Sequence, residues 1–370
     1  MIKRTRLFLT ILIALLTLTT AVWLLAEEEG GASTTNGFIT EYPIPVANSA
    51  PQSIVVASSG PPATVWFTMP DADAIGRLVV TDAVNFTFST FTTVDGITAS
   101  SAPHDLVYDA ANSLIWFTEP GNASLGRLNI TNGNITEIAL PGSHVPLNLD
   151  MAPNGLLYIT SPTTNHILSY NPTSTNFTLY PYNGVGGNPT LIDILGNNSI
   201  WFTSPATDRV VELTPSSGNF VSIPVQDILS SQTLTPTGLT LDASDPWITA
   251  SEANRIGRYA EGTLSLWRWY ELLPENSGTS AITYTSSGTY KYLWFVQTDL
   301  GQVGRMTLNS SDNDLLQHIA HSLSGAASQP TDVAVDENGV AWITGKGSNV
   351  IGQWVSPYVN YVNLPLVLRP

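Results

Sequence analysis

Short runs of alternating apolar and polar residues recur along the chain, and residues 101–128 show the repeating unit most clearly. One run ends at Asp109, four polar or small residues follow at 110–113, and a second run extends from Leu114 to Glu119. Two such runs around a short turn predict an antiparallel hairpin. In that register Asp109 faces Leu114, and His104 faces Glu119. Directly opposed residues have Cβ atoms about 5 Å apart.

The unit recurs seven times. An aromatic residue marks the second run of each repeat, at intervals of 42 to 50 residues: Trp66, Trp116, Tyr158, Trp201, Trp247, Trp294 and Trp342. A third run carries a Gly-Arg pair in several repeats, as in Gly76-Arg77 and Gly126-Arg127. A fixed period of this length with about four short strands per repeat is typical of propeller blades. We therefore predict an all-β, seven-bladed β-propeller of four-stranded blades over residues 38–355. Its large aromatics should fill the gaps between blades.

The first strand-like segment, residues 38–45, matches the fourth strand of a blade although no blade precedes it. We expect this N-terminal strand to close the ring by pairing with the last blade, which would cover exposed strand edges. Residues 361–366 also resemble a fourth strand, so the C-terminal tail, 356–370, is the alternative closing strand.

Residues 1–26 combine three basic residues with a long apolar run. This pattern predicts either a secretory signal peptide or a retained membrane anchor. Residues 27–37 are polar and rich in glycine, as expected of a linker. Because positive residues stay on the cytoplasmic side, the ring should be extracellular, periplasmic or on the cell surface.

Composition narrows the possible functions. The formal net charge of −16 argues against a nucleic-acid partner, because such proteins concentrate basic residues. Cysteine is absent, which excludes thiol chemistry and cysteine-ligated metals. A domain of this size can bury enough apolar surface without disulfides, and we expect it to be a monomer.

Candidate chemistry lies where the first strand of each repeat begins and the second ends, positions that we expect to face a central channel. Only the second repeat offers a titratable pair there, His104 and Glu119. Such a pair could act as base and orienting carboxylate, or could simply form a hydrogen-bonded polar contact. The remaining polar candidates for substrate binding are Gln52, Thr190, Thr237, Gln297 and Thr331. The other four histidines are expected to be solvated.

The repeated pattern of Pro-His, Trp-Phe-Thr-Glu, Leu-Gly-Arg and Ile-Thr-Glu resembles that of the virginiamycin B lyase, or streptogramin lyase, family. The resemblance covers residues 38 to about 355. It implies a seven-bladed ring that opens a cyclic depsipeptide at its ester by elimination, with magnesium. It also implies that His104 matches the catalytic histidine and Glu119 one metal-binding glutamate. The family's other glutamate falls on Ala102, and its second histidine falls on Gln52.

Two functions follow from this incomplete set. The first is a non-catalytic binding or scaffold module that takes a peptide, glycan or protein at the channel rim, without a cofactor. The second is an active carbon–oxygen lyase that uses His104 and Glu119, for which magnesium would be needed. Elimination requires charge stabilisation as well as a base. Because Ala102 stands where the family has its second glutamate, the sequence favours the binding module over the lyase.

Overall fold

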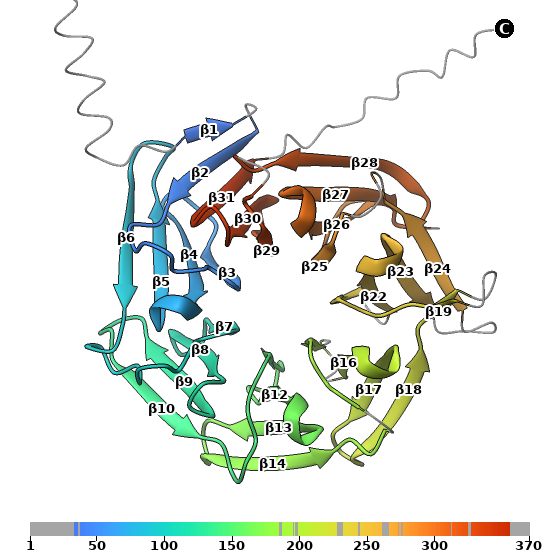
Figure 1. Cartoon of the computed structure of the whole chain (residues 1–370), viewed down its shortest axis with the longest axis horizontal. Coiled ribbons are helices and arrows are strands. Elements are labelled where there is room, and N and C mark those ends of the chain that lie inside the picture. The colour runs from blue at the N-terminus through green and yellow to red at the C-terminus, as the bar shows by residue number, and fades with distance from the viewer. Residues whose placement is uncertain are drawn as a thin grey trace, which may run out of the picture.

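A computed structural model describes the chain at residues 33–35, 38–184, 187–194, 196, 199–227, 232–242, 245–260, 266–272, 274, 277–311, 313–324 and 327–355. Seven antiparallel sheets formed by these residues surround a central axis (Figure 1). The sheets follow one another around the ring in chain order. The predicted all-β, seven-bladed propeller is confirmed.

Each blade runs outwards from an inner strand beside the axis. The first three blades are β3 (Ile54–Ser58), β4 (Ala63–Met69), β5 (Ala74–Val80) and β6 (Phe86–Phe91); β7 (Leu106–Asp109), β8 (Leu114–Glu119), β9 (Ser124–Asn129) and β10 (Ile135–Ala139); and β11 (Leu149–Met151), β12 (Leu157–Ser161), β13 (His166–Asn171) and β14 (Asn176–Pro181).

The next three blades are β15 (Ile192–Ile194), β16 (Ile200–Ser204), β17 (Arg209–Thr214) and β18 (Asn219–Pro224); β21 (Gly238–Asp242), β22 (Asp245–Ala250), β23 (Arg255–Ala260) and β24 (Leu266–Glu271); and β25 (Thr279–Ser287), β26 (Tyr290–Gln297), β27 (Gln302–Asn309) and β28 (Leu315–Ser322). A small hairpin of β19 (Gln226–Asp227) and β20 (Gln232–Thr233) lies between the fourth and fifth blades.

Single 3-10 turns follow the second strand in five blades: η1 (Pro70–Ala72), η2 (Pro162–Thr164), η3 (Pro205–Thr207), η4 (Ser251–Ala253) and η5 (Thr298–Leu300). Each ends at a residue in the left-handed region, such as Asn165 with φ of 58°. The turns reverse the chain at one face of the ring before the third strand begins.

The last blade combines both ends of the described chain. It contains β29 (Pro330–Val335), β30 (Val340–Gly345) and β31 (Val350–Val355), to which β2 (Ile39–Pro43) adds as the fourth strand. A short strand β1 (Ser33–Thr35) extends this sheet by pairing with β2 (Figure 1). The N-terminal closure expected from the sequence is therefore confirmed. The C-terminal tail, 356–370, lies outside the described residues.

The repeated aromatic fills the space between blades, as predicted. All seven of these side chains are at most 1% exposed. Trp116 packs against Leu149 and Leu157 of the third blade, and Trp342 packs against residues of the first. This places the largest apolar side chains at the interface of successive sheets, where they contribute most to burial.

The Gly-Arg pair on the third strand supports the same packing in a way that the sequence did not predict. An added Cβ at Gly126 would lie 2.1 Å from the ring of Phe117, so only glycine leaves room for that ring. The Arg127 guanidinium lies 5.8 Å from the ring centroid of Trp116, its register partner in the same sheet. Stacking on tryptophan stabilises the cation while leaving it hydrated on one side.

Threonines of the Trp-Phe-Thr type join successive blades. Five of them donate a side-chain hydrogen bond to a backbone carbonyl on the inner segment of the next blade: Thr68 to His104 (2.9 Å), Thr118 to Leu147 (2.7 Å), Thr160 to Thr190 (2.7 Å), Thr249 to Ser280 (2.6 Å) and Thr344 to Gln52 (3.2 Å). The last of these bonds connects the final blade to the first. The inner segments are thus fixed relative to one another around the axis.

Replacing Thr160 with valine should lower the free energy of unfolding by about 1–3 kcal/mol, the usual cost of leaving buried polar groups unpaired. Thr160 is fully buried and also accepts a hydrogen bond from the Asn148 amide at 3.0 Å. Denaturant unfolding measures this cost. Thr160→Ser keeps the hydroxyl and should lose less, so equal losses in the two variants would contradict the role given to the hydrogen bonds.

Within the described part of the chain, no helix is long and apolar enough to cross a membrane. The expected signal peptide or anchor at residues 1–26 lies outside that part, as do most residues of the expected linker, 27–37.

Candidate functional site

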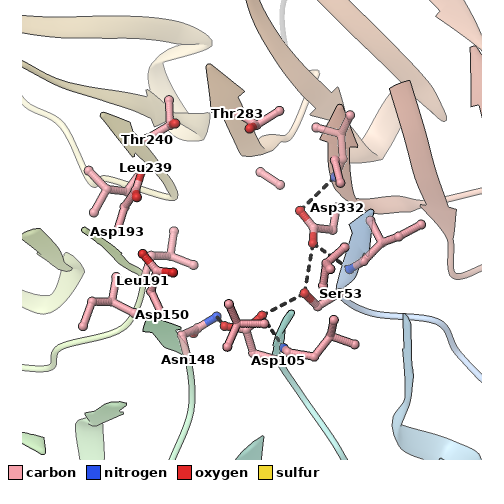
Figure 2. A pocket seen from close by; sticks show the side chains of 18 of the residues that line it. Ser53, Asp105, Asn148, Asp150, Leu191, Asp193, Leu239, Thr240, Thr283 and Asp332 are labelled. Carbon is pink, nitrogen blue, oxygen red and sulfur yellow. Dashed lines mark hydrogen bonds between the residues drawn. The ribbon is translucent and has the colours of Figure 1, made fainter. Parts of the chain in front are cut away.

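The inner strands of all seven blades enclose a central cavity of about 560 Å³ (Figure 2). Four aspartates contribute to its lining, and none of the lining residues is lysine or arginine. These aspartates, which the sequence analysis did not single out, are Asp105, Asp150, Asp193 and Asp332.

Two of the four aspartates, Asp105 and Asp332, belong to an arc of hydrogen-bonded side chains that spans four blades. The Ser53 hydroxyl lies 2.8 Å from Asp105 Oδ1 and 3.0 Å from Asp332 Oδ2. Asn148 extends the arc by donating to Asp105 Oδ2 at 3.1 Å (Figure 2). The serine hydroxyl has one proton and can donate to only one of the two carboxyl groups. Both contacts become hydrogen bonds when Asp332 holds a proton.

Burial raises the pKa of Asp332 to about 6, and the charge of Asp105 acts in the same direction. Backbone amides act against this shift, because Ile54 and Val333 donate to the Asp332 carboxylate at 3.0 and 2.8 Å. Near pH 6, the carboxyl group of Asp332 is therefore present in both its charged and its protonated form.

Asp150 and Asp193 form a second acidic pair on the part of the lining that adjoins Asn148, at the left of the view in Figure 2. They occupy a position two residues further along the inner strand than Asp105 does, as counted from the proline that precedes each strand. Burial raises the pKa of Asp193 to about 6. It raises the pKa of Asp150 well above its usual value, and the neighbouring Asp193 adds to that effect.

These aspartates also have a structural role. Asp105 accepts the Leu149 amide at 2.9 Å, Asp193 accepts the Leu241 amide at 2.9 Å, and Asp332 accepts the Ile54 amide. Each bond runs from one inner strand to the backbone of another. Inner strands have no sheet partner on the channel side, so their amides need such acceptors. The same bonds hold the carboxyl groups in fixed positions around the cavity.

His104 lines this cavity, at the start of the inner segment of the second blade. Its backbone amide donates to the Thr118 carbonyl at 3.0 Å, and the Thr118 amide donates to the Asp105 carbonyl at 2.9 Å. His104 and Asp105 therefore both face Thr118, as in a β-bulge, and the prediction that His104 faces Glu119 is wrong. The predicted pairing of Asp109 with Leu114 is confirmed. Burial lowers the pKa of the His104 imidazole, and Asp105 is the carboxylate that acts in the opposite direction.

Among the described residues, no hydrogen bond joins Glu119 to that imidazole. Glu119 is fully buried and is absent from the cavity lining. Besides burial, the groups that shift the pKa of the Glu119 carboxyl group are Glu137, Ser101 and Asp73, and His104 is not one of them. Burial raises the pKa of Glu119 to about 8, and the nearby Glu137 adds to this shift. Glu119 is therefore predominantly protonated at neutral pH, which makes it a poor orienting carboxylate for His104.

Of the other predicted binding residues, two line the cavity and three do not. Gln52 and Thr331 line the cavity, but the Thr331 hydroxyl lies 2.9 Å from the Gln52 carbonyl and donates to the backbone. Thr190 and Thr237 are absent from the lining. The Thr190 hydroxyl shares a hydrogen bond with the Thr203 hydroxyl at 2.7 Å, and the Thr237 hydroxyl donates to the Thr279 carbonyl at 3.0 Å. Gln297 is fully buried. Glu119 and Gln297 both stand at the end of a second strand, are fully buried and are absent from the cavity lining, contrary to the prediction that such positions face the channel.

A magnesium site of the family type does not fit these residues. Within the described chain, no group of three or more histidine, aspartate and glutamate side chains is arranged to hold a metal ion. Ala102 and Gln52 occupy the positions of the second glutamate and the second histidine, and neither offers a charged ligand. Mg²⁺ requires several oxygen ligands in near-octahedral geometry, which one buried glutamate cannot supply.

The fold and the cavity define a seven-bladed propeller with a polar, acidic central channel. The sequence profile of the virginiamycin B lyase family matches residues 90–351. The chain belongs to that family.

Solved structures agree with the fold. Virginiamycin B lyase from Staphylococcus aureus is 20% identical with a TM-score of 0.72, over 86% of this chain and 99% of that one. A streptogramin B lyase is 24% identical with a TM-score of 0.71, over 85% and 96% of the two chains. A catalytically inactive histidine-to-alanine variant of the S. aureus enzyme, solved with quinupristin, is 20% identical with a TM-score of 0.71, over 86% and 99%. No curated protein matches the sequence.

Proposed function

We propose that this propeller is a binding module that holds a peptide or glycan at its central channel, and that it does not catalyse elimination. The observation that carries this proposal is that Glu119 is not part of the cavity wall that His104 lines. The histidine lines the cavity, whereas the glutamate is buried away from it and is predominantly protonated at neutral pH. A base without a charged partner or metal lacks the means to stabilise a developing enolate.

Several properties of the cavity support ligand binding. Its volume of about 560 Å³ lies within the range of small-molecule sites, roughly 300–1,000 Å³. Backbone amides already hold the carboxyl groups of Asp105, Asp193 and Asp332 in place. Ligand binding would therefore lose little further side-chain entropy at the wall. With four aspartates and no lysine or arginine in the lining, the site favours uncharged or cationic groups over carboxylates and phosphates. A peptide amine or a sugar hydroxyl has the required chemistry.

The alternative is an active lyase. Membership of the virginiamycin B lyase family favours it, as does the position of His104, whose lowered pKa keeps the imidazole neutral and able to accept a proton. In this case His104 would be the base, and the missing charge stabilisation would have to come from the substrate or from an ion that the substrate brings.

Incubating the full-length protein with quinupristin, with and without Mg²⁺, distinguishes the two functions. Elimination leaves the mass unchanged, so retention time and fragmentation must be compared. We expect intact quinupristin under both conditions. A linear product that is absent with the His104→Ala variant would overturn the proposal and establish the lyase.

Binding is tested with arrays of short peptides and of glycans, followed by titration of any probe that is retained. The His104→Ala variant should weaken binding about fivefold, as expected for the loss of one hydrogen bond at the channel wall. Val94→Ala is the matched control, because Val94 is 90% exposed and does not line the cavity. Equal affinity in wild type and His104→Ala would place the ligand outside the channel and contradict the proposal.

The location of the ring remains part of this proposal. The basic and apolar N-terminal segment supports export, with the propeller acting outside the cytoplasm as a monomer. The N-terminus of the mature protein, read by mass spectrometry, distinguishes cleavage of residues 1–26 from retention as an anchor.

A further inference from the structure

Two histidines of the third blade lie together, away from the cavity wall. His144 belongs to the segment that leads into the inner strand, and His166 is the first residue of β13. Their ring centroids are 4.6 Å apart and the rings are inclined at 62°. The sequence predicted solvated histidines here, but His144 is only 9% exposed. The turn η2 brings the two rings together because it reverses the chain between β12 and β13.

Thr164, in that turn, contacts both rings, and each ring uses its Nδ1 atom for the contact. His166 Nδ1 lies 2.6 Å from the Thr164 carbonyl oxygen, and His144 Nδ1 lies 2.5 Å from the Thr164 hydroxyl. A carbonyl oxygen can only accept, so His166 Nδ1 carries the proton and the neutral ring has its lone pair on Nε2. The hydroxyl can accept from His144 Nδ1 in the same way, while Ser161 lies 2.9 Å from it on the other side.

The two Nε2 atoms are available to a ligand. In the described part of the chain neither has a hydrogen-bond partner, and neither is sealed off from solvent. Metal-binding histidines commonly donate their second ring nitrogen to a carbonyl or another fixed acceptor, which orients the ring and raises its basicity.

We propose that His144 and His166 form a two-histidine site for a late first-row divalent cation, Cu²⁺ or Zn²⁺, bound through the two Nε2 atoms. Imidazole suits these ions, whereas Mg²⁺ and Ca²⁺ prefer oxygen ligands. No third histidine, aspartate or glutamate completes the group among the described residues. The remaining coordination positions are open to water or to a donor atom of a ligand. The site is independent of the channel and of the function proposed for it.

Cu²⁺ titration of the full-length protein at pH 7, followed by electron paramagnetic resonance, tests the proposal directly. We expect one equivalent of bound Cu²⁺ with hyperfine structure from two imidazole nitrogens. Zn²⁺ should compete for the same equivalent, and Mg²⁺ should not. A spectrum without coupling to two nitrogens, or the absence of tight binding at one equivalent, would overturn the site without any use of variants.

Histidine variants locate the ion. Either His144→Gln or His166→Gln should weaken Cu²⁺ binding at least tenfold, whereas the matched control His318→Gln on β28 should leave the affinity unchanged. Thr164→Val removes the hydroxyl acceptor but keeps the carbonyl, and should weaken binding by ~10-fold through loss of orientation. Unfolding midpoints measured without metal show that each variant is folded. Full affinity in both His144→Gln and His166→Gln would contradict the proposal.

Discussion

Replacing Glu119 with glutamine should make the folded protein more stable than wild type at pH 8, while the two differ least near pH 4. Burial raises the pKa of Glu119 from 4.5 to about 8 in the folded state. The stability that comes with the protonated form is complete below the unfolded-state pKa and is lost as pH rises towards the folded-state pKa. Each pH unit in this window costs the wild type up to about 1.4 kcal/mol. The accumulated difference should reach a few kcal/mol.

Denaturant unfolding at a series of pH values from 4 to 8.5 measures this effect. The control is Glu252→Gln, which removes an equal charge from an exposed position on η4. Its stability should follow the wild-type pH dependence closely. Because Asp193 and Asp332 also have raised pKa values, some decline with pH will persist in Glu119→Gln. If the Glu119→Gln and wild-type curves run parallel, the buried glutamate is not protonated in the way that the structure indicates.

Replacing Tyr42 with alanine should lower the free energy of unfolding by roughly 3–5 kcal/mol, as is common when a large buried aromatic is truncated. Tyr42 lies on the closing strand β2, is fully buried and packs between Trp342 of the last blade and Phe86 of the first. Its loss weakens the contact that joins the two ends of the ring. Denaturant unfolding followed by tryptophan fluorescence measures the loss.

Two variants separate the contributions of the ring and the hydroxyl. Tyr42→Phe keeps the ring but removes the hydrogen bond to Gln353 Oε1 at 2.8 Å, and should cost about 1 kcal/mol. Phe38→Ala, just before β2, should cost less because Phe38 is 45% exposed. A Tyr42→Ala variant as stable as Phe38→Ala would show that closure by β2 contributes little to stability.

The prediction from sequence succeeded where a repeat could be compared with its own copies. The spacing of Trp66, Trp116 and their counterparts predicted the blades, and the extra strand at 38–45 predicted how the ring closes. The pairing of Asp109 with Leu114 was also predicted, because the turn between them is short and the pattern is local. These features depend on neighbours in the chain.

The candidate site was predicted less well because it depends on side-chain direction. A one-residue slip in the strand pairing sets the backbone of His104 against Thr118, and only the histidine, not Glu119, lines the cavity. The four channel aspartates were missed, although a signal for them exists: Asp105 and Asp332 are each the second residue after the proline that precedes an inner strand. Comparing that position across repeats would have identified this pair.

The sequence by itself determined the number of blades, the strands within them and the strand that closes the ring, because alternation and period are properties of adjacent residues. Only the tertiary structure decided which polar side chains meet. Asp105 and Asp332 are more than two hundred residues apart in sequence, but Ser53 contacts both. His144 and His166 meet through a turn whose geometry no pattern of apolar residues specifies. Blade twist and the packing of each sheet on the next determine whether a polar residue points into the channel or into the interface.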